Sequence, residues 1–315
     1  MALSLGVPAY WMGTLVPVIG GPIFALVMGI ALRLVRAPAA YFQPGLTFGQ
    51  KTLLQAAVVM SGSALTIRQI WSAGTLATPL ILITILAGLV LIPYLGRSFG
   101  LGGKVTHLVA VGTAICGATA IGAVTPVIAA TAAEMAYAIS TIFVFNTLAV
   151  VVYPLLGHLS GFTDWMFGLW TGTAIHDTSS VLAAAYSFSE QAGQYATVVK
   201  MARTTMLLPV IVGYGLLAGG DQKLSLSATL RKFPQFVLWF AVAAAMNSLG
   251  WIPASVAPVA RFLSKFLMVA ALAAVGLNTD FKAVTRIGPR PMLLGLAASL
   301  LIGGVSWAII RLFYA

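Results

Sequence analysis

Long apolar stretches, separated by short polar or Gly- and Pro-containing connections, occupy most of this 315-residue chain. Several run for about 20 residues with few charges, the length at which an α-helix crosses a bilayer. The pattern predicts an all-α polytopic membrane protein, because a membrane β-barrel would show short alternating segments instead. We predict about ten transmembrane segments, counting each interrupted one once: 15–35, 50–67, 75–96, 104–129, 132–156, 163–187, 192–218, 233–250, 257–278 and 290–312.

Two of these segments are interrupted by polar sequences that begin alike. Segment 104–129 contains Gly-Thr-Ala-Ile-Cys-Gly from Gly112, and segment 163–187 contains Gly-Thr-Ala-Ile-His-Asp from Gly172. Polar backbone at membrane depth is tolerated only where it is buried in protein or lines a cavity. Paired interruptions of this kind indicate a transporter's binding site near the bilayer midplane. Each segment is predicted to be either a broken crossing helix or a re-entrant hairpin, and the sequence leaves both open.

A second internal repeat relates residues 25–82 to residues 239–296 through a shift of 214 positions without a gap. The identical pairs include Pro44 and Pro258, Phe48 and Phe262, Lys51 and Lys265, Gly62 and Gly276, and Gly74 and Gly288. The equivalent segments are seven apart in chain order, and an odd separation predicts opposite orientations, as in an inverted repeat. We therefore predict one membrane transporter domain over 1–315, with a core around 104–218 and the repeat-related segments beside it.

The composition supports a membrane protein and explains the charge. The chain is 60% hydrophobic and 7% charged, with a mean hydropathy of +1.01 and a net charge of +11. Most basic residues flank apolar segments, where they set topology, so we expect no nucleic-acid partner. The strongly basic loops share one side, predicted to be cytoplasmic; they contain Arg33, Arg36, Lys51, Arg97, Lys104, Lys223, Arg231, Lys232, Lys282, Arg286 and Arg290. Arg68, Arg261, Lys265 and Arg311 fall on the other side.

The single cysteine, Cys116, rules out an intrachain disulfide framework and a multi-cysteine metal site. We expect no metal and no cofactor. The first dozen residues lack the basic start and clean apolar run of a secretory signal.

Two basic residues lie unusually deep in an apolar segment. Lys200 and Arg203 come eight to eleven residues into segment 192–218, which places them near the bilayer centre on one helix face. A charge at that depth is costly and indicates function. The alternatives are a buried ion pair with Asp177 or Glu134, or a segment that begins later and leaves Lys200 at the interface.

The interrupted segments supply the remaining candidates. In the second break, Thr178 and Ser179 begin a half-helix whose N–H groups and hydroxyls would hold an anion, and Thr113, Cys116 and Gly117 occupy the corresponding break. Three residues are candidates for proton coupling: His176, Asp177 and Glu134. Asp177 could instead cap the half-helix, and His176 could be a hydrogen-bonded core residue. Asn146 is interpreted as an interhelical hydrogen-bonding residue.

Four motifs in order along the chain resemble the YeiH-like sulfate exporter family of bacterial inner-membrane proteins. They begin at Gly112, Glu134, Gly172 and Val199. The resemblance covers nearly the whole chain and implies a multi-pass inner-membrane secondary transporter, with sulfate or a related sulfur oxyanion as substrate. It also implies the plan of the bile-acid and arsenite transporters, a core of broken helices with a flanking panel. Family members usually carry a full helix where this chain has residues 1–14, so we expect a shortened N-terminus.

Together these observations favour sulfate export by alternating access, with Thr113, Cys116, Gly117, Thr178, Ser179, Lys200 and Arg203 as the substrate-binding residues. A H⁺- or Na⁺-coupled carrier of organic anions or sulfonates is the alternative and would need a larger, more apolar cavity. An intramembrane enzyme built on His176, Asp177 and Ser179 is disfavoured, because a catalytic triad needs groups that converge from different elements. The expected partners are a small anion, the lipid bilayer and, in a homodimer, a second copy of the chain.

Overall fold

The computed structural model describes residues 2–15, 20–36, 38–217, 235–253, 255–278 and 289–314, and within these ranges the chain forms helices and no strands. The first half of the chain contains α1 (Ala2–Leu15), α2 (Gly20–Val35), η1 (Ala40–Phe42), α3 (Gln43–Phe48), η2 (Gly49–Leu53), α4 (Leu54–Gly62), α5 (Ile67–Ser98), α6 (Gly103–Ala114), α7 (Ala118–Val124) and α8 (Ala132–Leu159). The second half contains α9 (Asp164–Ala174), α10 (Thr178–Phe188), α11 (Glu190–Thr205), α12 (Leu207–Leu217), α14 (Gln235–Ser248), α15 (Val256–Asn278) and α17 (Pro289–Phe313).

Five helices of the described chain are long and apolar enough to cross a membrane. They are Ile67–Ser98, Ala132–Leu159, Glu190–Leu217, Pro258–Asn278 and Pro289–Phe313, and shorter apolar helices cover Gly21–Val35 and Leu238–Ser248. The predicted all-α membrane class is therefore confirmed, while the count of ten segments stays a prediction.

The predicted boundary between the second and third segments is wrong. Segment 75–96 is part of α5, which begins at Ile67, because Thr66 and Gln69 form a capping box at its start. The Thr66 backbone N–H donates to Gln69 Oε1 at 2.8 Å, and Gln69 N–H donates to Thr66 Oγ1 at 3.3 Å. Two satisfied N–H groups stabilise a helix start here, so the residues between the two predicted segments open a helix of 32 residues. Residues 2–15 also form a helix, which precedes the first predicted segment.

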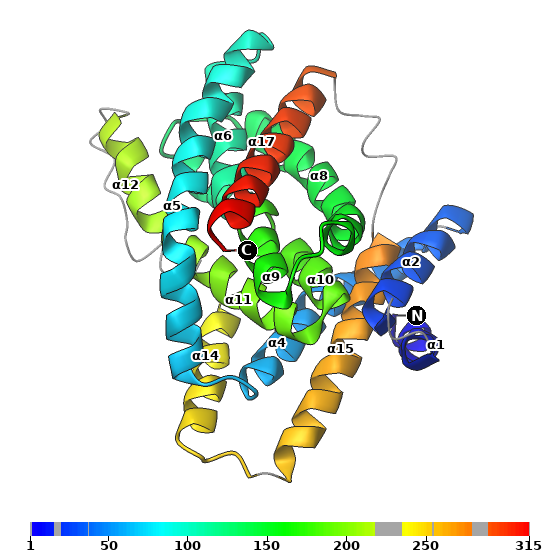
Figure 1. Ribbon diagram of the computed structural model, residues 1–315. Coiled ribbons are helices and arrows are strands. Elements are labelled where there is room, and N and C mark those ends of the chain that lie inside the picture. Colours follow the sequence, from blue (N-terminus) through cyan, green and yellow to red (C-terminus); the bar gives the residue numbers. More distant parts are fainter. Residues whose placement is uncertain are drawn as a thin grey trace.

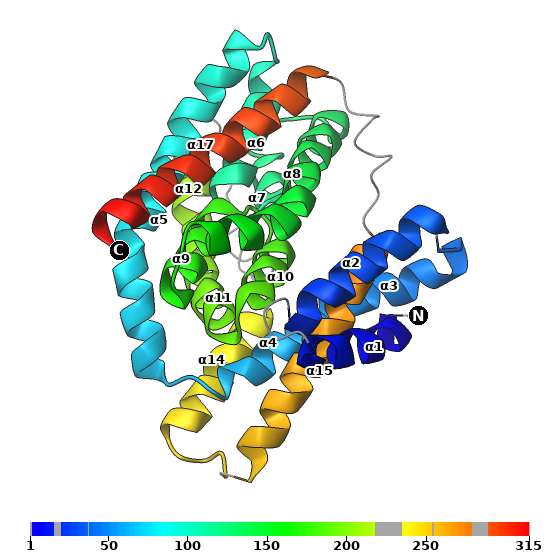
Figure 2. The same ribbon diagram turned by 45° about the vertical axis from the view of Figure 1, so that its right-hand side comes forward.

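The helices form two groups, which Figures 1 and 2 show side by side. The hairpin group contains α5 to α12 and α17. The flanking group contains α1 to α4, α14 and α15, in which α15 packs on α2, α1 and α4. The two groups touch where α10 meets α2, where α11 meets α4 and where α14 meets α5. Across the same boundary, Tyr186 of α10 donates a hydrogen bond to Ser61 Oγ of α4 at 2.7 Å.

Both interrupted segments are helical hairpins. Lys104 Nζ, at the start of α6, donates to the carbonyl of Ala129, after α7, at 2.7 Å, so the two ends of the first hairpin lie together. Ser189, after α10, donates to Asp164 Oδ1, at the start of α9, at 2.6 Å, which closes the second hairpin in the same way. Because α8 runs its full length between them, the two hairpins enter from opposite ends of the hairpin group (Figure 1). We name these ends the Lys104 end and the Asp164 end.

Glycine residues allow close helix packing in the flanking group. A Cβ at Gly62 of α4 would lie 2.7 Å from the carbonyl oxygen of Phe240 in α14. A Cβ at Gly276 of α15 would collide with the carbonyl oxygen of Leu26 in α2. Gly62 and Gly276 are 214 positions apart, and so are Leu26 and Phe240. The α4–α14 and α15–α2 pairs are thus built at equivalent positions.

Candidate functional site

The tips of the two hairpins meet in the middle of the hairpin group. The first tip is residues 115–117, between α6 and α7, and the second is residues 175–177, between α9 and α10. Gly117 has φ of 63° and ψ of −128°, a conformation that side chains disfavour. A Cβ on Gly117 would lie 3.6 Å from the Cα of Asp177, so one tip is in direct contact with the other. We call this meeting point the crossing.

Lys200 binds the carbonyl groups of both tips. Its Nζ donates to the carbonyls of Ile115 at 2.8 Å, Ile175 at 3.0 Å and His176 at 2.6 Å, and the side chain is fully buried. An ammonium group has three donors, and all three are used. Helix α11 carries Lys200 to this depth because Ser189 caps its start and the helical run continues to Leu217.

Arg203 lies one turn further along the same face of α11 and is also fully buried. Its Nε donates to the carbonyl of Ala114 at 2.7 Å and its Nη2 to the carbonyl of Thr113 at 2.8 Å. Weaker contacts from Nη1 reach the carbonyls of Gly172 at 3.5 Å and Ile175 at 3.4 Å. One guanidinium therefore holds the carboxyl ends of both α6 and α9.

Neither cation forms the ion pair that the sequence left open with Asp177 or Glu134. Within the described ranges, the hydrogen bonds that Lys200 and Arg203 donate all go to backbone carbonyls. Those carbonyls belong to the C-terminal ends of two half-helices, which carry the negative ends of their dipoles and lack intrahelical partners. The two cations thus compensate negative partial charges of the backbone. A direct contact with an anion would require these bonds to be exchanged.

Asn146 of α8 supports the second tip from the other side. Its Oδ1 accepts from the backbone N–H of His176 at 3.1 Å and of Asp177 at 3.3 Å. The expected interhelical role of Asn146 is confirmed. The sequence pointed to this residue only as a lone amide within an apolar segment.

Asp177 caps α10, one of the roles considered for it. Its Oδ2 accepts from the Ser180 N–H at 3.1 Å. Thr178, Ser179 and Ser180 follow in the first turn of α10 and are partly exposed. Asp177 and Ser180 line a cavity of about 20 Å³ against α2, η2 and α15 of the flanking group. The amino end of α10 therefore faces the boundary between the two groups.

The chain matches a family of membrane proteins. The family described as conserved hypothetical protein 698 matches residues 1–295. The chain belongs to this family. A UPF0324 membrane protein of Clostridium tetani is 34% identical over 97% of this chain and 93% of its own length. UPF0324 membrane proteins of Streptococcus pyogenes serotype M18 and Streptococcus pneumoniae are each 38% identical, over 98% and 93% of this chain and 94% and 90% of their own lengths. No solved structure matches.

His176 lies between the crossing and a cavity of about 540 Å³. Its Nε2 is 3.1 Å from Ser299 Oγ of α17. Its Nδ1 is buried and has no hydrogen-bond partner among the described residues. The cavity lies between α8, α9 and α17, and most of its lining is apolar. Leu148 and Leu300, exposed on the outer faces of α8 and α17, form part of its wall.

Of the other residues predicted to belong to the site, Thr113 and Cys116 lie at the crossing, whereas Glu134 lies far from it. Thr113 and Cys116 are buried in the first hairpin at or beside its tip. Glu134 lies elsewhere, in a capping box at the start of α8, where its Oε2 accepts from the Thr131 N–H at 2.7 Å. The crossing thus brings together the predicted residues of both breaks with Lys200 and Arg203, but not Glu134.

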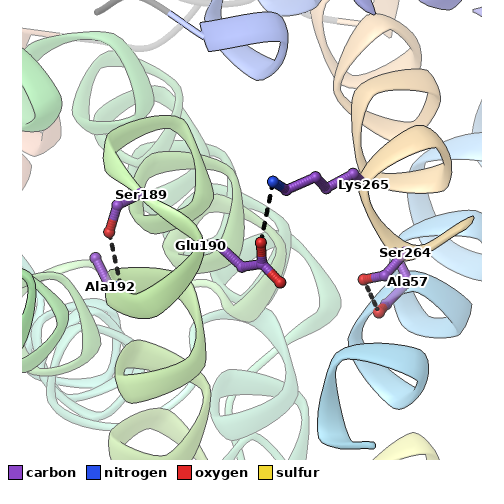
Figure 3. Close-up of polar contacts among 6 residues, drawn as sticks. All are labelled: Ala57, Ser189, Glu190, Ala192, Ser264 and Lys265. Atoms are coloured by element: carbon purple, nitrogen blue, oxygen red, sulfur yellow. Dashed lines mark hydrogen bonds and ion pairs between the residues drawn. The ribbon is translucent and has the colours of Figure 1, made fainter. Parts of the chain in front are cut away.

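A cluster of charged side chains lies between the two groups at the Asp164 end. Lys265 of α15 forms an ion pair with Glu190 of α11 at 3.1 Å, which Figure 3 shows spanning the space between the two helices. One cavity of about 330 Å³ contains this pair, and another of about 450 Å³ is lined by Asp164, Glu190 and Arg261. The boundary between the groups therefore contains two cavities with charged side chains in their walls at this end.

Proposed function

We propose that this protein is a secondary transporter that moves a small oxyanion across a bacterial inner membrane by alternating access, with sulfate export as the first candidate. The observation that carries the proposal is the crossing: two hairpin tips from opposite ends meet at a point braced by two buried cations. Broken helices that meet at the middle of a membrane bundle form the binding sites of secondary transporters.

The charges at the crossing favour an anion. Lys200 and Arg203 cover the negative C-terminal ends of α6 and α9, while the positive amino end of α10 is offset by the single carboxylate of Asp177. Thr178 and Ser179 add hydroxyl donors beside it. We propose that these residues bind the anion together with Thr113, Cys116 and Gly117 of the opposite tip, and that Lys200 and Arg203 attract it through space.

The cavities support movement of the hairpin group against the flanking group. The cavity next to Asp177 and Ser180 has about 20 Å³, enough for about one water and too little for an oxyanion. The cavities at the Asp164 end of the same boundary are far larger. This state is therefore more open at the Asp164 end, so an exported anion would leave the crossing through that end, and the two groups would separate there to release it.

Equivalent packing within the flanking group supports the predicted inverted repeat and the plan of the bile-acid and arsenite transporters. The α4–α14 and α15–α2 contacts use residues 214 positions apart. Helices α5 and α17, related by the same shift, run in opposite directions beside each other (Figure 1). A two-fold relation of this kind exchanges the two ends of the transporter during alternating access.

The distribution of basic residues supports an orientation. Arg97, Lys104 and Arg290 lie at the Lys104 end, where Arg290 is close to Gly100, while Arg68, Arg261, Lys265 and Arg311 lie at the other end. The sequence predicts that the remaining basic loops share the side of the Lys104 end, so by the positive-inside rule we propose that this end is cytoplasmic. In a Cys116→Ser background, we expect an impermeant maleimide added outside intact cells to label Asp164→Cys but not Lys104→Cys; the reverse pattern would reject this orientation.

Sulfate counterflow into proteoliposomes tests the function. We expect radiolabelled sulfate to accumulate in vesicles preloaded with unlabelled sulfate, and Ser179→Ala to weaken this accumulation by raising the sulfate concentration it needs. Ser98→Ala, which removes an exposed hydroxyl at the end of α5, is the matched control. Absence of counterflow in folded wild-type protein would reject sulfate as the substrate.

The cavity of about 540 Å³ favours a second candidate, a H⁺- or Na⁺-coupled carrier of organic anions or sulfonates. This cavity is mostly apolar and reaches His176 at the second tip, so it would accept an apolar tail attached to an anionic group. Alkyl sulfonates of increasing chain length should then compete better than sulfate, and Ser299→Trp, which would fill the cavity, should abolish that preference.

A further inference from the structure

We propose that Lys200 is a built-in cation: its ammonium group occupies, at the crossing, a carbonyl site that would otherwise bind a free monovalent cation. With Lys200 in place, the crossing needs no free cation to balance these carbonyls. The consequence for transport rests on the function proposed above, whereas the test of cation binding does not.

The ligands of the ammonium group carry the argument. Three backbone carbonyls, of Ile115, Ile175 and His176, surround Nζ at 2.6 to 3.0 Å. Carbonyl oxygens at helix breaks and at the C-terminal ends of half-helices are the groups with which secondary transporters hold coupling cations. Rings of carbonyls likewise replace the hydration shell of K⁺ in channels. The site therefore has the chemistry of a monovalent-cation site, with the cation supplied by the chain.

The identity of the side chain fits this role. Lysine ends in a compact point charge with three donors, whereas arginine presents a planar fork. Lys200 fills a three-carbonyl site, and Arg203 bridges the carbonyls of Thr113 and Ala114 on the adjoining helix end. Since α11 anchors both side chains, the positive charge at the crossing is supplied by the chain and does not depend on the Na⁺ concentration.

Removing the ammonium group should uncover the site. Lys200→Ala removes the charge and vacates its space, so the three carbonyls should bind Na⁺, Li⁺ or K⁺. Lys200→Met also removes the charge but keeps most of the side-chain volume, so it should leave the site blocked. The two variants separate cation binding from a general loss of packing.

Cys116 provides the readout, because it is the only cysteine and lies buried in the first tip beside Ile115. We would measure the rate at which a maleimide labels Cys116 in purified protein at equal ionic strength, comparing NaCl, LiCl and KCl with choline chloride. For Lys200→Ala we expect at least one small cation to slow labelling about tenfold relative to choline, which corresponds to a cation concentration near nine times its Kd. Wild type and Lys200→Met should label at the same rate in all four salts.

Two results would overturn the proposal. One is a folded Lys200→Ala protein whose Cys116 labelling is the same in all four salts; the other is Na⁺-dependent protection of the wild type, which would mean that a free cation binds despite Lys200. If Lys200→Ala does not fold, Lys200→Ser takes its place, and the wild-type measurement still decides. No transport is measured, so failure of sulfate counterflow would leave this result unaffected.

Discussion

Replacing Arg203 by methionine should loosen the crossing without unfolding the rest of the protein. The Arg203 guanidinium donates hydrogen bonds to two carbonyls in the last turn of α6, those of Thr113 and Ala114, with N–O distances of 2.8 and 2.7 Å. Carbonyls in the last turn of a helix have no intrahelical partner. Methionine keeps much of the side-chain volume but cannot donate a hydrogen bond.

The size of the effect follows from the groups left without partners. Each buried carbonyl that loses its donor costs about 1–3 kcal/mol, so two of them cost about 2–6 kcal/mol. Removing the guanidinium also removes the cost of burying its charge, which favours the lower end of that range. A loss of about 2 kcal/mol corresponds to about a 30-fold change in the equilibrium between the closed and open crossing.

Labelling of Cys116 measures that equilibrium. Its thiol is 5% exposed in the first tip, so a maleimide reaches it only when the crossing opens. If opening and closing are fast relative to labelling, the labelling rate is proportional to the open population. We therefore expect Arg203→Met to label about 30-fold faster than wild type.

Arg68→Met is the control, because Arg68 is exposed in the first turn of α5, away from the crossing. It should label at the wild-type rate. A labelling rate for Arg203→Met within threefold of wild type, in protein that elutes as a single folded species, would refute the view that Arg203 holds the tips together.

Three further predictions follow from the packing. Asn146→Leu leaves the N–H groups of the second tip without an acceptor and should speed Cys116 labelling about tenfold or more, whereas an unchanged rate would mean that another acceptor replaces it. Gly276→Ala should lower the thermal midpoint by several degrees, because its Cβ meets a backbone carbonyl of α2, while Gly45→Ala, with open space around it, should not. A double-mutant cycle on Glu190 and Lys265 should give a coupling energy below about 1 kcal/mol that falls with added salt, since Lys265 is 59% exposed; a larger, salt-independent value would contradict a solvated pair.

The helical class and the two helix breaks could be predicted because they have sequence signals. The twin motifs from Gly112 and Gly172 mark the breaks, and apolar runs mark the helices. The choice between a crossing helix and a hairpin was left open, because it depends on contacts such as Lys104 with Ala129 that no local pattern encodes. The start of α5 was missed because the capping box at Thr66 looks like a polar loop.

The partners of Lys200 and Arg203 could not be predicted for a related reason. Their depth in the segment was visible from spacing, and carboxylates were the natural partners to expect. The structure uses backbone carbonyls instead. Every residue has a backbone carbonyl, so a site made of carbonyls cannot be recognised from residue types. The sequence shows only the helix break that exposes the carbonyls.

The crossing also explains why only one of the two equivalent helices, α11, carries buried basic residues. A shift of 60 positions places the first hairpin and α8 on the second hairpin and α11, and it puts Ser140 and Phe143 of α8 at the positions of Lys200 and Arg203. Two hairpins that never met would each need their own cations to satisfy their C-terminal carbonyls. Because the tips are in contact, one pair on α11 serves both. Ser140 and Phe143 are exposed on α8, so neither position is buried at the crossing, whereas the buried, neutral Asn146 supplies the acceptor for the second tip.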